Sequence, residues 1–157
     1  MYQKFFGLQE APFGLTPDTD FFYANANHQE ALNTLLLALQ MGEGFIKVSG
    51  EVGTGKTLLC RKLLNELAQE DRYVTAYVPN PDLTPSALRY TVATELGLTI
   101  QRNLGQAKTM ERLNEFLLQQ KAAGKQVVLV VDEAQVLSTE CLETVRLLTN
   151  LETEKAK

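Results

Sequence analysis

The chain has few of the features that mark a secreted or membrane-spanning protein. It holds only two cysteines, Cys60 and Cys141, in separate apolar stretches without a partner motif. We expect both to be reduced and buried in a cytosolic protein. Its longest wholly apolar runs have 5 residues, as at residues 127–131, far short of a bilayer span. The first residues show no basic region followed by an apolar stretch, which predicts no signal peptide.

Positive charge is also scarce. The chain has 15 Lys and Arg against 19 Asp and Glu, for a net charge of −4. A broad nucleic-acid footprint needs clustered cations, so this balance argues against nucleic acid as a partner. What the chain does have is 45% apolar residues over 157 positions. That content is sufficient for one globular domain with an ordinary core.

The apolar pattern alternates between helical spacing and short β-rich runs. It predicts helices over residues 28–41, 56–69, 85–96, 108–122 and 139–149, and strands over residues 45–49, 73–78 and 126–131. Gly42 and Gly44 are expected to end the first helix. Thr84, which Pro85 follows, is expected to cap the N-terminus of the third helix. Ser138 is expected to cap the last helix. Strands that alternate with helices indicate an α/β fold with a parallel sheet.

An aromatic segment, residues 1–27, precedes the first expected helix and is punctuated by Pro12, Gly14 and Pro17. We expect an irregular arm whose phenyl rings pack onto the core. The phenylalanines of this arm are Phe5, Phe6, Phe13, Phe21 and Phe22. Residues 28–157 are predicted to form the rest of a single domain.

The segment GEVGTGKT, residues 50–57, lies between an expected strand and a helix; we call it the glycine loop. It matches G-x-x-x-x-G-K-[ST], whose glycines let the backbone curl so that several N–H groups point at one anion. Lys56 supplies a mobile cation for the outer phosphates, and the Thr57 hydroxyl is a ligand for Mg²⁺. The alternative is a flexible glycine turn, but the flanking strand and helix favour phosphate binding. The predicted nucleotide-binding residues are Gly50, Glu51, Val52, Gly53, Thr54, Gly55, Lys56, Thr57 and Leu58.

A second motif, VVLVVDEAQ, places two acids directly after an apolar strand. At the carboxyl end of that strand, Asp132 is expected to hold a Mg²⁺-bound water, and Glu133 to orient or deprotonate an attacking water. The alternative, a strand that ends in solvated acids, is weakened by the presence of the glycine loop. The acid pair favours an ATPase of the additional-strand type over a small-molecule kinase. The predicted cofactors are therefore ATP or ADP, with Mg²⁺, and Lys56 and Glu133 are the main catalytic candidates.

Several longer stretches resemble one family. They are GEVGTGKTLLCRKLL, NPDLTPSALR, VVLVVDEAQVLS, VRLLTNLET and the opening FGLQEAPFGLTPDTDFFY. Together they resemble the AAA+ ATPases of the general secretion pathway protein A type along essentially the whole chain. Within that family they look closest to the branch that serves biogenesis of the mannose-sensitive haemagglutinin (MSHA) pilus. The resemblance implies a P-loop NTPase fold, a three-layer sandwich with a parallel sheet, in which residues 28–157 form a partial AAA+ domain behind the arm.

The resemblance also implies a setting. It indicates a cytoplasmic ATPase of Gram-negative bacteria that works with inner-membrane proteins to assemble a type IV pilus or a type II secretion apparatus. It implies a homo-oligomer, because the arginine finger of AAA+ proteins normally acts across a subunit interface. At LETEKAK the chain departs from the family, whose members continue into a sensor strand, the finger and a helical lid. We therefore expect hydrolysis by the full-length protein and little or none by this stretch alone.

Two more roles follow from the resemblance. In AAA+ proteins a polar residue at the end of the second strand can hold the catalytic glutamate away from water, and Asn80 occupies that place opposite Glu133. The alternative is that Asn80 is a turn residue. His28, with Tyr23 and Leu15, is a candidate lining of an adenine pocket. The alternative is a surface or half-packed residue at a helix start.

Two other functions stay open at this stage. One is a nucleotide-gated binding module, in which ATP occupancy sets a conformation that a partner recognises and turnover is incidental. The other is a transposition-type AAA+ regulator that coats DNA. The net charge of −4, without a basic run, speaks against the second.

Overall fold

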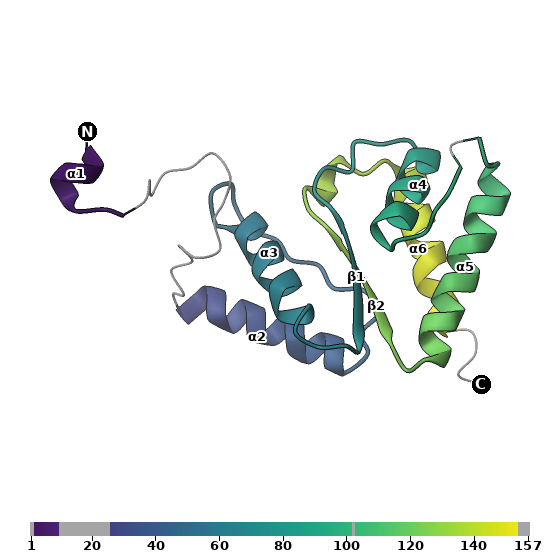
Figure 1. Ribbon diagram of the computed structural model, residues 1–157, viewed down its shortest axis with the longest axis horizontal. Helices are drawn as coiled ribbons and strands as arrows, with labels where there is room; N and C mark the ends of the chain where they lie inside the picture. The colour runs from purple at the N-terminus through teal and green to yellow at the C-terminus, as the bar shows by residue number, and fades with distance from the viewer. Residues whose placement is uncertain (1, 10–25, 102, 154–157) are drawn as a thin grey trace. The chain divides into compact units, whose positions relative to one another are not determined.

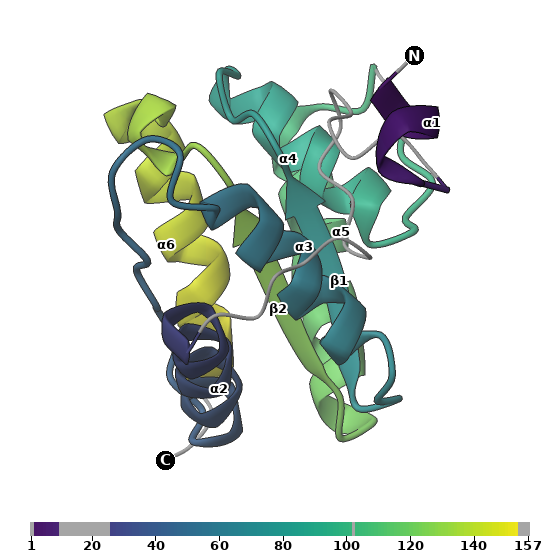
Figure 2. The same cartoon turned by 90° about the vertical axis from the view of Figure 1, so that its left-hand side faces the viewer.

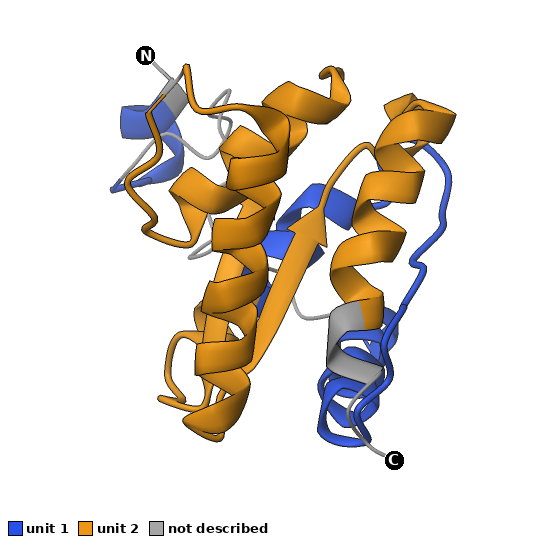
Figure 3. Cartoon of the chain, turned by 90° about the vertical axis from the view of Figure 1, so that its right-hand side faces the viewer, with its two compact units in different colours: residues 1–63 blue, residues 64–157 orange. Residues whose placement is uncertain are grey.

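The computed structural model describes residues 2–9, 26–101 and 103–153 (Figure 1). The chain divides into two compact units, residues 1–63 and residues 64–157 (Figure 3). Phe13, Phe21 and Phe22 of the expected arm lie outside the described residues, as do Leu15 and Tyr23. None of the helices in the described ranges combines the length and the apolar composition that crossing a bilayer demands.

The first unit contains α1 (Tyr2–Phe6), α2 (Ala26–Gln40) and the glycine loop, which leads into α3 (Lys56–Leu67). Helix α2 buries Leu32, Leu35 and Leu39, three positions at the helical spacing that the sequence predicts. Gly42 follows α2 with φ +78°. Glycine adopts this left-handed conformation without strain, which confirms the predicted end of the helix.

The irregular arm predicted for residues 1–27 begins instead with a short helix, α1, so the prediction is wrong for residues 2–6. The rings of Phe5 and Phe6 pack edge to face with their centroids 4.9 Å apart. They are otherwise open, with 82% and 68% of their surfaces exposed. The packing of the remaining arm stays a prediction.

The strand predicted over residues 45–49 is also wrong. Within the described residues, this segment has no regular structure, and the one sheet pairs two other segments. A strand is defined by hydrogen bonds to a neighbouring strand, and an apolar run does not by itself supply that neighbour. Phe45 and Val48 are accordingly 65% and 47% exposed.

The second unit is built on a parallel pair of strands, β1 (Tyr73–Val78) and β2 (Gln126–Val131), which lie side by side in Figure 2. Both have the predicted bounds, and their pairing confirms the predicted parallel sheet. The register pairs Tyr73 with Gln126 and Val78 with Val131. Both strands therefore end at the same edge of the sheet, and the side chains that follow them are brought to that edge.

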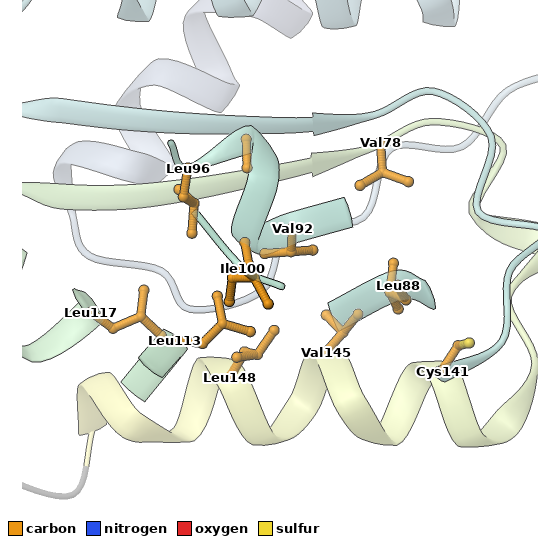
Figure 4. Packing of buried hydrophobic residues seen from close by; sticks show 12 residues of the cluster. Val78, Leu88, Val92, Leu96, Ile100, Leu113, Leu117, Cys141, Val145 and Leu148 are labelled. Carbon is orange, nitrogen blue, oxygen red and sulfur yellow. The ribbon is translucent and has the colours of Figure 1, made fainter. Parts of the chain in front are cut away.

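Helices α4 (Pro85–Glu95), α5 (Gln106–Ala122) and α6 (Thr139–Thr153) lie on one face of this sheet (Figure 1). The chain runs β1–α4–α5–β2, the kind of crossover that parallel neighbours require. The strands and helices share a buried core (Figure 4): Ala76, Val78, Leu88, Val92, Ala93, Leu96, Ile100, Leu113, Leu117, Cys141, Val145 and Leu148. Cys141 is buried as predicted, but Cys60 is only half-buried, so the expected burial holds for one cysteine.

Polar contacts tie the three helices together. The Arg89 guanidinium on α4 donates to Gln106 Oε1 at 2.8 Å and to Thr144 Oγ1 at 3.3 Å. At the start of α6, the Ser138 hydroxyl oxygen accepts from Cys141 N at 3.2 Å, which confirms the predicted cap. The two Arg89 bonds join α4 to α5 and α6.

Thr84 caps α4, and this cap gives a first prediction. Its hydroxyl oxygen accepts from Ala87 N at 3.2 Å, and Pro85 occupies the first turn. Thr84→Ala removes that acceptor, so we expect the free energy of unfolding to fall by about 1 kcal/mol, measured by urea unfolding. Thr94→Ala is the matched control, because the Thr94 hydroxyl bonds only within α4 to Tyr90 O and alanine is the better helix former. Equal losses in the two variants would contradict the capping role.

Candidate functional site

The predicted site residues are divided between the two units. Residues 50–57, the glycine loop, belong to the first unit, while Asn80, Asp132 and Glu133 belong to the second. Leu58 follows the loop within the first turn of α3. Each of the two groups of residues is therefore described within its own unit.

A tight turn over residues 51–54 curls the glycine loop. Thr54 N and Thr54 Oγ1 both donate to Glu51 O, at 3.4 Å and 2.8 Å. Gly53 and Gly55 have φ values of +81° and +85°, which residues with a Cβ rarely adopt. A Cβ at Gly50 would lie 2.9 Å from Thr54 Oγ1. The left-handed φ values thus favour glycine at positions 53 and 55, and of these Gly55 is specified by the motif.

Lys56 is the first residue of α3, and its side chain returns to the loop. Its Nζ donates to Gly50 O at 2.8 Å and to Glu51 O at 2.6 Å. These two carbonyls fix the position of the ammonium group beside the curled backbone. A phosphate oxygen is a charged acceptor and bonds an ammonium more strongly than a neutral carbonyl does.

Helix α3 begins directly at the loop. Its first intrahelical bond runs from Leu59 N to Gly55 O at 2.9 Å, so the preceding amides form the N-terminal end, where the helix dipole is positive. Thr57 lies in this first turn and is half-buried; its hydroxyl is the kind of oxygen ligand that Mg²⁺ accepts. Curled glycines, an ammonium and a helix N-terminus in one segment fit a Mg²⁺-bound polyphosphate.

His28, near the start of α2, contacts the glycine loop. Its Nε2 lies 2.7 Å from Thr54 O, and since a carbonyl can only accept, Nε2 carries the hydrogen and donates it. A Cβ at Gly55 would lie 3.1 Å from the same Nε2. No pattern in the sequence predicts this contact, although His28 is half-buried, as one alternative expects. The adenine-pocket role stays a prediction.

Asp132 follows β2 at the carboxyl edge of the sheet and is only 7% exposed. Its amide donates to Val78 O at 3.0 Å, which extends the β1–β2 ladder by one residue. Its Oδ1 accepts from Glu133 N at 2.9 Å. Buried carboxylates need such partners, and these bonds hold Asp132 at the edge of the sheet where the sequence predicts it.

Glu133 is exposed and has a left-handed backbone with φ +51°, which among the described residues is the one positive φ outside glycine. It begins the short turn η2 (Ala134–Val136), in which Val136 N donates to Glu133 O at 3.0 Å. Its carboxylate accepts a hydrogen bond from the Gln135 side-chain amide. Gln135 is not among the residues predicted from the sequence. The only available signal was its position two residues after Glu133, because periodicity does not predict such a turn.

Asn80 lies just beyond β1 at the same edge of the sheet. Its Oδ1 accepts from Asp82 N at 3.3 Å, the local bond that asparagine typically makes in turns. The bonds found for these side chains join Asn80 to Asp82 and Glu133 to Gln135. They match the turn-residue alternative, and the switch role of Asn80 stays a prediction.

Comparisons with known proteins identify the family. A family model described as AAA domain matches residues 39–157. The whole chain is 43% identical to General secretion pathway protein A of Aeromonas hydrophila, but it spans only 28% of that protein's length. No solved structure matches the chain. The family predicted from the quoted motifs is confirmed, and because the matched region covers well over half of its residues, this chain belongs to the AAA domain family.

Proposed function

We propose that the protein binds ATP with Mg²⁺ and, when intact, hydrolyses it. The observation that supports this most directly is the glycine loop, where the curled backbone, the Lys56 ammonium and the N-terminus of α3 lie in one segment. AAA domains are P-loop NTPases, so the family supports the same ligand as the loop geometry.

Each predicted residue has a role in this proposal. The amides of residues 50–58 hold the phosphates, and Lys56 compensates their charge. Thr57 would supply an oxygen ligand to Mg²⁺, and Asp132 would hold a Mg²⁺-bound water; the ion, when bound, neutralises phosphate charge. Glu133 takes the proton of a water whose oxygen attacks the terminal phosphorus, and the bond from that phosphorus to ADP breaks. The products are ADP and inorganic phosphate.

We propose further that turnover supports assembly of a secretion or pilus apparatus. The support is the 43% identity to General secretion pathway protein A, whose name states a secretion role. In this proposal the protein is cytoplasmic, assembles with itself through its AAA domain, and contacts inner-membrane proteins of a type II secretion system or of an MSHA-type pilus. Co-purification from membranes, with and without ATP, tests this part.

Removal of Mg²⁺ tests the nucleotide part. Intact protein should bind a non-hydrolysable ATP analogue in the presence of Mg²⁺, and its affinity should fall by about tenfold or more in excess EDTA. The reason is that the phosphate charge is then left to the loop and Lys56 alone. Isothermal titration calorimetry at matched ionic strength measures both affinities. Absence of any Mg²⁺-dependent nucleotide binding would refute the proposal.

A nucleotide-gated binding module is the second candidate. The observation that favours it is the bond from the Gln135 amide to Glu133 Oε2, because it engages one of the two oxygens that a general base would offer to water. In such a module ATP occupancy alone would set the recognised conformation. The Glu133→Gln variant considered in the Discussion separates the two candidates.

A further inference from the structure

We propose that His28 is a positioning residue of the glycine loop. By donating to Thr54 O, it turns the Gly55 N–H toward the nucleotide phosphates. The inference rests on the proposed function, because it concerns the same nucleotide. It assigns to α2 a direct part in shaping the loop. His28 lies outside the motif of residues 50–57, so the motif alone does not predict this role.

The His28 bond acts on the peptide unit between Thr54 and Gly55. The Thr54 carbonyl and the Gly55 amide share it, and in a trans peptide C=O and N–H point in opposite directions. His28 Nε2 holds the carbonyl oxygen at 2.7 Å on the side of α2. The Gly55 N–H is therefore directed to the opposite side of the loop. Loops of this pattern bind phosphate through N–H groups that point to a common centre.

The orientation of this peptide needs an external support. Gly53 and Gly55, at φ +81° and +85°, make the curl possible, but glycine also has the most conformational freedom to lose. A flip of the peptide between residues 54 and 55 would present a carbonyl oxygen, and hence a repulsive dipole, to an anion. Lys56 tethers the carbonyls of Gly50 and Glu51, whereas His28 tethers the carbonyl of Thr54.

The absence of a Cβ at Gly55 leaves room for the imidazole. A Cβ at that position would lie 3.1 Å from His28 Nε2 and 3.6 Å from His28 Cε1. The ring itself is carried by α2, a helix of 15 residues with a buried face. A helix is a stiffer support than a loop for a side chain that must hold one geometry. His28 thus links the loop to the packing of α2.

Three variants of the intact protein test the role. His28→Ala removes the donor, His28→Gln keeps an amide N–H at about the reach of Nε2, and His28→Asn places the amide nearer the backbone, short of Thr54 O. We expect affinity for Mg²⁺ and a non-hydrolysable ATP analogue to fall about fivefold to tenfold in the alanine and asparagine variants. The glutamine variant should stay within about twofold of wild type. The glutamine and asparagine variants are matched in charge and polarity, so a difference between their affinities reports the position of the N–H donor.

A second ligand separates loop positioning from an adenine pocket. Inorganic tripolyphosphate with Mg²⁺ offers the phosphates without a base. Loop positioning predicts the same relative loss of affinity for tripolyphosphate in His28→Ala as for the ATP analogue. An adenine contact predicts a loss for the ATP analogue alone. Thermal unfolding of the glutamine and asparagine variants shows whether they are equally folded.

The outcomes separate a failure of the proposed nucleotide function from a failure of the role of His28. Wild-type protein that binds neither the ATP analogue nor tripolyphosphate would overturn the proposed nucleotide function itself. Wild-type binding with an unchanged affinity in His28→Ala would overturn only the role of His28. A loss that glutamine does not restore, or that is confined to the ATP analogue, would overturn it as well.

Discussion

Replacing Glu133 with glutamine should slow ATP hydrolysis by the intact protein by about 10²- to 10⁴-fold, while Mg²⁺-ATP affinity stays within about twofold. A carboxylate can accept the proton of the attacking water, and an amide of the same shape cannot. The side chain is exposed immediately after the buried Asp132, at the edge where both strands end. The new amide can still pair with Gln135, so the turn should be retained. Steady-state phosphate release and calorimetry measure the two quantities.

Glu140 provides the matched control for this substitution. It is exposed in the first turn of α6, and Glu140→Gln makes the same chemical change away from the predicted base. Hydrolysis should be unaffected in this control. Unchanged hydrolysis in Glu133→Gln would contradict the general-base role and would favour the nucleotide-gated binding module. Gln135 donates to one oxygen of the Glu133 carboxylate, Oε2, so Oε1 is the oxygen that we expect to take the proton.

Lys56→Ala should weaken binding of the Mg²⁺-bound ATP analogue by about 10- to 100-fold. The ammonium now bonds two neutral carbonyls, Gly50 O and Glu51 O. A bond to phosphate would be charge-assisted, and the net contribution of such bonds, about 1.5–3 kcal/mol, corresponds to the expected loss. Calorimetric titration measures the affinity directly.

Lys125→Ala is the control for the loss of a positive charge. Lys125 is exposed in the turn between α5 and β2, so its removal changes net charge equally without touching the glycine loop. Its affinity for the analogue should match that of wild type. If Lys56→Ala bound as tightly as this control, the glycine loop would not be the phosphate site.

The second unit of the fold could be predicted closely from the sequence. The bounds of β1 and β2 were predicted correctly because each is a short β-rich run, ended by Pro79 or by the acids of DEAQ. The cap at Thr84 was predictable because a capping bond is local and depends on residue types a few positions apart. Helices α5 and α6 differ from their predicted ranges only at one end each, where periodicity is least informative.

The strand predicted over residues 45–49 is absent from the described structure, because local residue types do not by themselves determine a strand. Its apolar residues meet the local requirement for a strand, but a strand is a relation between two segments. Local composition does not predict whether a second segment lies where it can form hydrogen bonds with the first. The same limit applies to α1, whose 5 residues are too few to show a helical period.

For the candidate site, the glycine loop was predictable because its backbone itself requires glycine, as at Gly53 and Gly55. The His28 bond to Thr54 O was not, because it joins residues 26 positions apart through a side chain. The Gln135 bond to Glu133 depends on a left-handed residue that no periodic pattern reveals. The sequence thus identified the chemical groups, whereas the bonds that orient them required the structure.

At position 133, the left-handed backbone favours glycine or asparagine, whereas the proposed general base requires a carboxylate. At φ +51° most residues with a Cβ are strained, by about 1–3 kcal/mol. Glycine, which has no Cβ, or asparagine, whose short side chain tolerates this conformation, would relieve most of that strain. A carboxylate at this position therefore lowers the resistance of the fold to heat. Selection for thermal robustness alone would favour removing it, so under the proposed general-base role robustness and turnover cannot both be maximal at position 133.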